Sequence, residues 1–304
     1  MVTECKSIWM DGKLVSWQDA QVHVLTHALH YGVGVFEGLR CYKGDGGSYV
    51  FRLQDHTRRL FNSAKILRLD IPFSEGEINQ AILETIRDND LEACYVRPLV
   101  FSGEGAMGIY APDNPVRVSI AAWPWGSYLG EDGIVKGIRV QTSSFSRHHV
   151  NSAMTRAKAS GYYVNSVLAK REAKSCGFDE ALLLDVNGFV AEGSGENLFV
   201  VKDGVLWTPT LTSVLDGITR NSVITLAKDR GYSVIERPLT RDDVYCADEV
   251  FFTGSAAEVT PVRELDHRII GNGKRGPVTE ALQGAYFDAV HGRGDHHAEW
   301  LTRV

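Results

Sequence analysis

Lys158 lies in surroundings that favour covalent chemistry at its amine. The stretch MTRAKASGYY (154–163) places small residues on both sides of this lysine and two tyrosines, Tyr162 and Tyr163, just after it. A lysine that forms a Schiff base needs space for a planar ring and aromatic neighbours beside the amine. The alternative is an ordinary solvated lysine at the start of a helix. The segment makes Lys158 a candidate for Schiff-base formation.

Glu192 is the candidate for an acidic partner in the same chemistry. It lies in VAEGSGENLF (190–199), with apolar runs on either side and Gly193 and Gly195 as close neighbours. A charged residue is rarely buried without a partner. A carboxylate in this position suits the protonated nitrogen of an aromatic ring, because the opposite charge offsets part of the cost of burial.

Two turns contain donors for a phosphate group. In DGITRNSV (216–223) a glycine precedes a predicted helix, whose first N–H groups and positive dipole end attract anions, and Thr219 adds a hydroxyl. TGSAAE (253–258) follows a predicted strand and offers Ser255 with the backbone N–H groups of Ser255 and Ala256. An amine, a carboxylate and phosphate donors are what pyridoxal 5′-phosphate requires of a protein. Together these stretches predict one site for that cofactor.

Other motifs with chemical potential are incomplete. His23, His27 and His30 have the spacing of a metal site, but no paired carboxylate or cysteine completes the set, so structural histidines and no metal are expected. In EGSGEN the glycines flank Ser194 directly, which does not satisfy the G-x-S-x-G pattern of serine hydrolases. The sequence also has no P-loop and no well-placed G-x-G-x-x-G.

Composition excludes several classes of protein. The chain has 304 residues, 44% of them hydrophobic and 23% charged, which is ordinary for a globular protein of two domains or one large one. A net charge of -6 argues against nucleic-acid binding. No apolar run approaches the ~18 residues of a membrane span, and no export signal is visible. The five cysteines are scattered without a C-x-x-C pair. We expect a cytoplasmic protein without membrane or nucleic-acid partners.

The elements that must position these residues predict an α+β fold. Asp11-Gly12, Asn187-Gly188 and Asp203-Gly204 are hairpin turns between apolar runs, which favours antiparallel or mixed sheets. The aromatic and glycine-rich stretch WPWGSYLGEDG (123–133) is typical of a connector with a function of its own. We therefore expect a small domain over 1–122, an interdomain loop over 123–135 and a large domain over 136–304. A strand is predicted from Val35 through Phe36 to Tyr42. Helices are predicted at about 55–69, from 74 onward, where Ser74 and Glu77 have the spacing of a capping box, and at about 159–174, 218–230 and 277–290.

Nearly the whole chain resembles a known family. The stretches that carry the resemblance are HALHYGVGVFEGLR (27–40), YVRPLVF (95–101), RAKASGYY (156–163), DVNGFVAEGSGENLF (185–199), DGITR (216–220) and FTGSAAEVTPV (252–262). They resemble the class IV aminotransferases, pyridoxal-phosphate enzymes with the D-amino acid aminotransferase-like fold, also called fold type IV. Tyr95 with Arg97, Trp125, and FEGLR ending at Arg40 resemble the bacterial-type branched-chain amino acid aminotransferases in particular.

The resemblance implies a role for each site residue. Lys158 would join the cofactor through a Schiff base, Tyr163 would bond the ring's phenolate oxygen, and Glu192 would pair with the pyridinium nitrogen. The phosphate would be held by Arg59, Gly217, Ile218, Thr219 and Ser255. Substrate would be bound by Tyr31, Phe36, Gly38, Arg40, Tyr95, Arg97, Ile109, Trp125, Tyr128, Ser255 and Ala256. Among these, Tyr95 and the Ser255–Ala256 backbone would hold the substrate's α-carboxylate, and Arg97 would meet the distal carboxylate of glutamate.

The implied reaction is reversible amino transfer between a branched-chain L-amino acid (Leu, Ile or Val) and 2-oxoglutarate, giving a branched 2-oxo acid and L-glutamate. Family members are homodimers at least and often hexamers, with the segment near Ile109 reaching a neighbouring subunit's pocket. The alternatives are a D-amino acid aminotransferase, an aminodeoxychorismate lyase of the same fold, and a cofactor-binding protein without turnover. Tyr162, Ser255 and Gly34 depart from the family's usual residues, which leaves the ranking of donors open.

Overall fold

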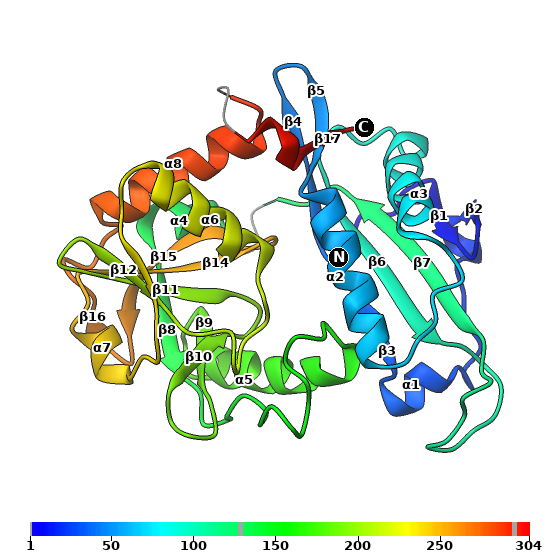
Figure 1. Ribbon diagram of the computed structural model, residues 1–304, viewed down its shortest axis with the longest axis horizontal. Coiled ribbons are helices and arrows are strands. Elements are labelled where there is room, and N and C mark those ends of the chain that lie inside the picture. Colours follow the sequence, from blue (N-terminus) through cyan, green and yellow to red (C-terminus); the bar gives the residue numbers. More distant parts are fainter. Residues whose placement is uncertain (1, 127–129, 294–296) are drawn as a thin grey trace. The chain divides into compact units, whose positions relative to one another are not determined.

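The computed structural model describes residues 2–126, 130–293 and 297–304. The chain forms two compact units, which are described separately (Figure 1). The first unit comprises Met1–Trp125, Ala157–Tyr162 and Ala289–Val304, and the second comprises Gly126–Arg156 and Tyr163–Asp288. The partition expected from the sequence, with an interdomain loop over 123–135, remains a prediction. Within the described ranges no helix is long and apolar enough to cross a membrane.

The first unit is built on an antiparallel sheet. In the described residues its strand order is β17-β5-β4-β6-β7-β1-β2, with β3 paired to β6. The β1–β2 hairpin turns at Asp11 and Gly12, both with positive φ, as a type I′ turn requires. The strands are β1 (Ser7–Met10), β2 (Lys13–Ser16), β3 (Gly34–Phe36), β4 (Leu39–Gly44), β5 (Gly47–Phe51), β6 (Cys94–Ser102), β7 (Val116–Trp123) and β17 (Leu301–Arg303).

Two amphipathic helices form the core of this unit together with the sheet. The helix α2 (Leu53–Ile66) packs on α3 (Glu75–Asp88) and β3, and α3 contacts β1, β6 and β7 (Figure 1). The predicted capping box is present, since Ser74 and Glu77 satisfy each other's backbone N–H groups at the start of α3. Shorter helical turns are η1 (Trp17–Asp19), α1 (His27–Tyr31), η2 (Ser160–Tyr162) and η3 (Ala298–Trp300).

The second unit is built on a mixed sheet of order β10-β9-β8-β15-β14-β11-β12-β13, with β16 paired to β15. The pairs β8–β9, β8–β15 and β12–β13 are parallel and the others antiparallel. The strands are β8 (Ile138–Thr142), β9 (Glu180–Leu184), β10 (Val190–Gly193), β11 (Asn197–Lys202), β12 (Val205–Thr208), β13 (Val234–Glu236), β14 (Glu249–Gly254), β15 (Glu258–Leu265) and β16 (Arg268–Ile269).

Helices cover this sheet (Figure 1). The helix α4 (Glu131–Lys136) contacts β15, α5 (Tyr163–Ser175) contacts β8 and β9, and α6 (Ile218–Asp229) contacts β13 and β14. Two further helices are α7 (Arg241–Tyr245) and α8 (Pro277–Val290). The hairpin turns predicted at Asn187-Gly188 and Asp203-Gly204 connect β9 to β10 and β11 to β12. The α+β class and the mixed sheets are confirmed.

Two expected elements differ in their bounds. The helix expected from about 159 begins as a 3-10 turn, and α5 starts only at Tyr163. The reason is a close backbone contact, because Gly161 donates to the Gly32 carbonyl and a Cβ at residue 32 would touch the Gly161 backbone. The strand expected from Val35 to Tyr42 is divided into β3 and β4, and the buried Glu37 lies between them.

Candidate active site

Lys158 lies in the first unit, on the segment that leads into η2. Its carbonyl accepts a hydrogen bond from Phe36 N at 3.0 Å, and its N–H donates to Ser63 Oγ at 3.1 Å. The next residue, Ala159, bridges to Val35 of β3. These bonds to β3 and α2 fix the backbone on both sides of the lysine. The Nζ atom lies 5.0 Å from the centroid of the Phe36 ring.

Arg97 shares the Phe36 ring with Lys158. The Arg97 guanidinium carbon is 4.8 Å from the Phe36 centroid and 5.3 Å from that of Tyr95, and Nη2 donates to the Tyr95 hydroxyl at 3.4 Å. Stacking on two aromatic faces holds a guanidinium in place. Within the described residues the buried Nε of Arg97 has no hydrogen-bond partner. A buried N–H group without a partner is stabilised by a hydrogen bond to an acceptor on a bound ligand, such as a carboxylate.

Tyr95 belongs to a cluster of large aromatic rings. Its centroid lies 4.3 Å from that of Trp125 and 5.5 Å from that of Trp123. Gly38 makes room for this arrangement, because a Cβ at residue 38 would overlap the Tyr95 hydroxyl. Arg40 of β4 lies directly opposite Tyr95 of β6. The structure therefore brings Phe36, Gly38, Arg40, Tyr95, Arg97 and Trp125 together with Lys158.

Two other expected substrate residues are exposed, and a third lies outside the described residues. Tyr31 is 45% exposed and packs its ring on His27, with centroids 4.6 Å apart. Ile109 is 94% exposed in the loop between β6 and β7. Tyr128 lies outside the described residues.

The candidate metal histidines have other contacts. His27 and His30 each have a ring nitrogen within hydrogen-bond distance of a backbone carbonyl, of Gly108 and Val24 respectively. Across the part of the chain that the structure describes, no three His, Cys, Asp or Glu residues are grouped as metal ligands.

Arg59 lies on α2 and forms a buried ion pair that the sequence did not reveal. It contacts Glu37 Oε1 through Nε at 2.6 Å and Oε2 through Nη2 at 2.9 Å, and His56 Nδ1 lies 2.7 Å from Oε2. Burial acts to raise the pKa of Glu37, but Arg59 and His56 outweigh it and hold that pKa well below its usual range. Burial lowers the pKa of His56, so its ring is neutral and acts as a hydrogen-bond donor.

Glu192 lies in the second unit on β10 and is 7% exposed. Its Oε1 is 3.1 Å from Arg147 Nε, and its Oε2 accepts from Asn197 Nδ2 at 3.2 Å and from Leu215 N at 3.1 Å. The bulge between Val190 and Glu192 turns this carboxylate out of the regular strand pattern. A buried carboxylate held by three groups is fixed in orientation before any ligand arrives.

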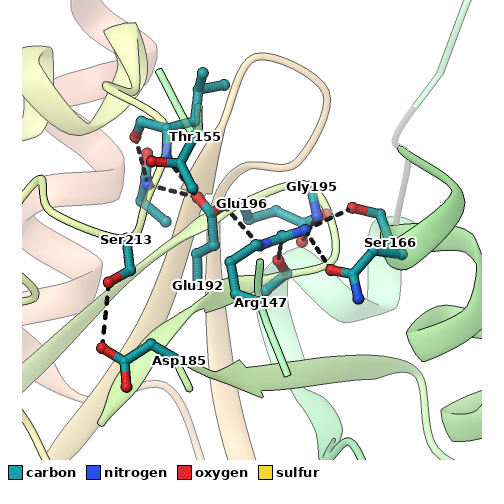
Figure 2. A network of polar contacts seen from close by, with 12 residues as sticks. Arg147, Thr155, Ser166, Asp185, Glu192, Gly195, Glu196 and Ser213 are labelled. Atoms are coloured by element: carbon teal, nitrogen blue, oxygen red, sulfur yellow. Dashed lines mark hydrogen bonds and ion pairs between the residues drawn. The ribbon is translucent and has the colours of Figure 1, made fainter. Parts of the chain in front are cut away.

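Arg147 is in turn held by its own partners. Its Nη1 donates to Asn165 Oδ1 at 3.0 Å and to Ser166 Oγ at 3.1 Å, and its Nη2 donates to the Gly193 carbonyl at 3.0 Å. Figure 2 shows the guanidinium extending between Glu192 and Ser166. The sequence did not single out Arg147, because SSFSRHHV has no local pattern that would predict a buried arginine.

The start of α6 supplies the predicted anion donors. Gly217 is its N-cap and forms no side-chain cap, and Ile218 and Thr219 are 8% and 2% exposed. The first N–H groups of such a helix are directed outward and attract anions. A Cβ at residue 217 would overlap the amide oxygen of Asn197, the same residue that bonds Glu192. One asparagine thus connects the carboxylate to the helix start.

The remaining residues that the sequence predicts at the site lie at the ends of elements. Ser255 and Ala256 form the turn between β14 and β15 and are half-buried. Tyr163 is the first residue of α5, the helix whose Asn165 and Ser166 hold Arg147.

The comparisons with known proteins agree with this chemistry. Residues 34–265 match the family model described as Amino-transferase class IV. The chain belongs to the class IV aminotransferases.

Individual members of this family are similar to the chain over almost its full length. A branched-chain-amino-acid aminotransferase of Pseudomonas aeruginosa is 59% identical over 297 residues, covering 98% of this chain and 97% of the relative. The crystal structure of the Escherichia coli branched-chain amino acid aminotransferase is 47% identical and superimposes with a TM-score of 0.97, covering 99% of both chains. The T.th. branched-chain amino acid aminotransferase complexed with N-(5′-phosphopyridoxyl)-L-glutamate is 51% identical, with a TM-score of 0.95 over 98% of both chains.

The side chains of this class IV aminotransferase fit pyridoxal phosphate in each unit taken by itself. The first unit holds an amine, Lys158, whose backbone is fixed on both sides, and an arginine, Arg59, in a bidentate ion pair. The second unit holds a buried carboxylate, Glu192, beside a fixed guanidinium, and a helix N-terminus without a side-chain cap. These are the groups that the cofactor's aldehyde, phosphate and ring nitrogen require.

Proposed function

We propose that the chain is a pyridoxal-phosphate-dependent aminotransferase that exchanges an amino group between branched-chain L-amino acids and 2-oxoglutarate. The support from the comparisons is the shared name of the Pseudomonas aeruginosa and Escherichia coli relatives and the glutamate adduct of the T.th. enzyme. The interpretation reached from the sequence motifs agrees with them.

The observation that carries the proposal is the single aromatic ring shared by two cations. Lys158 Nζ lies 5.0 Å from the Phe36 centroid, and the Arg97 guanidinium carbon lies 4.8 Å from the same centroid. An amine for the reacting carbon and an arginine for a distant carboxylate therefore lie against one apolar surface. Glutamate has both a reacting Cα and a distal carboxylate, and leucine has a side chain that packs on an aromatic ring.

The cofactor supplies a carbonyl that binds the substrate's amino group and a ring that withdraws electrons from the bonds at Cα. Lys158, Tyr163 and Glu192 would hold its aldehyde, phenolate oxygen and ring nitrogen. Arg59, the start of α6 from Gly217 to Thr219, and Ser255 would hold its phosphate. We assign these roles on the family's motifs and on the donor types found at each position.

The chain's own residues have three tasks in the reaction. Lys158 Nζ would be released when the substrate's amino group replaces it on the carbonyl, and it would then take the proton from the substrate's Cα. Hydrogen bonds to Phe36 N and Ser63 Oγ fix its backbone. Glu192 would keep a proton on the ring nitrogen by its negative charge, and Arg147 holds that carboxylate in place. Arg97 and the aromatic cluster of Phe36, Tyr95 and Trp125 accept the two kinds of side chain.

A screen of donors against acceptors tests the function. We expect L-leucine, L-isoleucine and L-valine to react with 2-oxoglutarate and to give stoichiometric L-glutamate and branched 2-oxo acid. Their D-enantiomers should be unreactive. Turnover of D-alanine with 2-oxoglutarate would favour a D-amino acid aminotransferase, and release of 4-aminobenzoate from aminodeoxychorismate would favour the lyase. Cofactor binding without turnover of any donor would reduce the protein to a binding role.

We also propose that the enzyme is cytoplasmic and forms a homodimer at least. Ile109 and Tyr110, which are 94% and 89% exposed in one loop of the monomer, support an oligomer because large apolar residues at such exposure favour burial by a partner. Analytical ultracentrifugation should give twice the chain mass or a higher multiple. A monomer at micromolar concentration would contradict this part of the proposal.

A further inference from the structure

Glu37 is a buried carboxylate to which the proposed function gives no task. It lies between Phe36 and Gly38, two residues of the proposed substrate pocket, and it is 0% exposed. Burying a carboxylate is costly unless charge and hydrogen bonds compensate it. The groups that contact Glu37 therefore indicate the role of this buried carboxylate.

Four hydrogen-bond donors contact the carboxylate of Glu37. Oε1 accepts from Arg59 Nε at 2.6 Å, and Oε2 accepts from Arg59 Nη2 at 2.9 Å, from His56 Nδ1 at 2.7 Å and from Gly38 N at 3.2 Å. Three of these four donors contact Oε2, which offers about two acceptor positions, so that oxygen is fully used. The ring of His56 has to donate through Nδ1, because an ionised carboxylate only accepts. A carboxylate with this set of donors is held in one orientation.

This ion pair determines the direction of the Arg59 side chain. A guanidinium is planar and rigid, so the edge formed by Nε and Nη2 faces Glu37 and the Nη1 atom is directed away from it. The same helix anchors the reactive lysine, since Ser63 Oγ donates to the Arg59 carbonyl and accepts from Lys158 N. His56, Arg59 and Ser63 are spaced at i, i+3 and i+7, so one face of α2 holds Glu37 and the Lys158 backbone.

We propose that Glu37 is a positioning residue for the cofactor's phosphate: it holds Arg59 so that the Nη1 side of the guanidinium meets the phosphate oxygens, while His56 and the Gly38 N–H hold Glu37. The proposal rests on the proposed function, in which Arg59 binds the phosphate of pyridoxal phosphate. The negative charge of Glu37 offsets the positive charge by which Arg59 attracts the phosphate. Any gain in phosphate binding from Glu37 must therefore come from the orientation that it gives to the guanidinium.

The test compares two aldehydes that differ only in the phosphate. The full-length apoenzyme is titrated with pyridoxal phosphate and with pyridoxal, and binding is followed by the cofactor's absorbance and by protein fluorescence. In Glu37→Gln the amide N–H₂ opposes the Arg59 donors and the two-bond pair is lost. We expect the Kd for pyridoxal phosphate to rise roughly tenfold to a hundredfold while the Kd for pyridoxal changes less than about twofold. Asp55→Asn is the matched control, because it also removes one negative charge, from a carboxylate on α2 that pairs with Arg52 and Arg58.

Two outcomes would overturn the proposal. An equal loss of affinity for both aldehydes would mean that Glu37 is only structural. Tighter binding of pyridoxal phosphate in Glu37→Gln would mean that Glu37 competes with the phosphate for Arg59. A double-mutant cycle with Arg59→Gln tests whether Glu37 acts through Arg59. Once Arg59 is absent, Glu37→Gln should have no further effect on the ratio of the two Kd values.

A second pair of variants keeps the test decisive if Glu37→Gln does not fold. His56→Leu removes one donor from Glu37 and should raise the Kd for pyridoxal phosphate selectively, by less than Glu37→Gln would. His56→Asn retains an N–H near the Nδ1 position and should restore the wild-type ratio. Equal ratios in His56→Leu and wild type would contradict the proposed role. If the wild-type apoenzyme binds neither aldehyde, the proposed function itself fails, which is a separate result.

Discussion

At the scale of single residues, Arg97 determines whether one site can serve two kinds of side chain. Its guanidinium packs between Phe36 and Tyr95, and its buried Nε has no hydrogen-bond partner among the described residues. A charge-assisted hydrogen bond contributes ~1.5–3 kcal/mol, so its loss weakens an interaction roughly tenfold to a hundredfold. We expect Arg97→Leu to reduce kcat/KM for glutamate and 2-oxoglutarate by that factor and for leucine much less.

Measuring the two half-reactions of Arg97→Leu separately checks this expectation. An equal loss for leucine and glutamate would mean that Arg97 serves only to support the aromatic cluster. Arg117→Leu is a suitable control, since this arginine lies on β7 of the same sheet and pairs with Asp11.

Glu192 carries the second prediction at this scale. Glu192→Gln preserves the shape of the side chain but removes the charge that pairs with Arg147 and that would keep the ring nitrogen protonated. We expect a large drop in kcat with pyridoxal phosphate still bound, because the phosphate contacts are unchanged. Steady-state kinetics and the cofactor content of the purified variant measure both. Turnover near that of the wild type would show that another group protonates the ring nitrogen.

At the scale of elements, the start of α6 depends on the absence of a side chain at residue 217. A Cβ there would overlap the amide oxygen of Asn197, which bonds both Glu192 and the Leu215 carbonyl. We expect Gly217→Ala to weaken binding of pyridoxal phosphate and to lower kcat together, because it disturbs the phosphate donors and the Glu192 contact at once. Gly284→Ala is the control, as a Cβ in that exposed position of α8 meets open space. Equal cofactor affinity in both variants would argue against the role of this helix start.

The sequence predicts these elements well where the signal is local. The Ser74–Glu77 capping box, the hairpin turns at Asp11-Gly12 and Asp203-Gly204, and the bounds of α6 depend on neighbours along the chain, and the structure contains them. The start of α5 depends on a contact between Gly161 and Gly32, which are distant in sequence. No window of residues around 159 contains that information.

The same distinction applies to the site. Lys158 and Glu192 could be proposed from the sequence because their own flanks are unusual, with small residues beside one and apolar runs beside the other. Glu37, His56, Arg147 and Asn197 act through partners up to several dozen residues away, as Arg147 does with Glu192. Their roles arise from tertiary contacts, so no local pattern could indicate them.

At the scale of the whole molecule, Glu196 couples stability to pH. It is 4% exposed, and burial together with the nearby negative charge of Glu180 raises its pKa to about 8. Lys170 forms an ion pair with Glu180 and only partly offsets this. The folded chain thus holds a proton on Glu196 that the unfolded chain releases near its ordinary value of 4.5. The stability from this proton is fully present below pH 4.5 and is lost as pH rises through about 8.

Glu196→Gln tests this coupling, because the amide cannot ionise. We expect the Tm of the wild type to fall more steeply than that of Glu196→Gln between about pH 6 and pH 9, in scanning calorimetry with saturating cofactor. Glu84→Gln, an exposed change on α3, should follow the wild type. Parallel curves for Glu196→Gln and the wild type would show that Glu196 is ionised throughout this range.

The central claim is that the chain transfers the amino group of a branched-chain L-amino acid by way of a cofactor on Lys158. A single-turnover experiment tests it most directly: the holoenzyme is mixed with excess L-leucine or D-leucine in the absence of any 2-oxo acid, and the 2-oxo acid and ammonia formed are quantified. We predict one equivalent of the branched 2-oxo acid per active subunit with L-leucine, no ammonia, no product with D-leucine, and no product from Lys158→Ala with either. Product from D-leucine, continuous release of ammonia, or full product from Lys158→Ala would contradict the account.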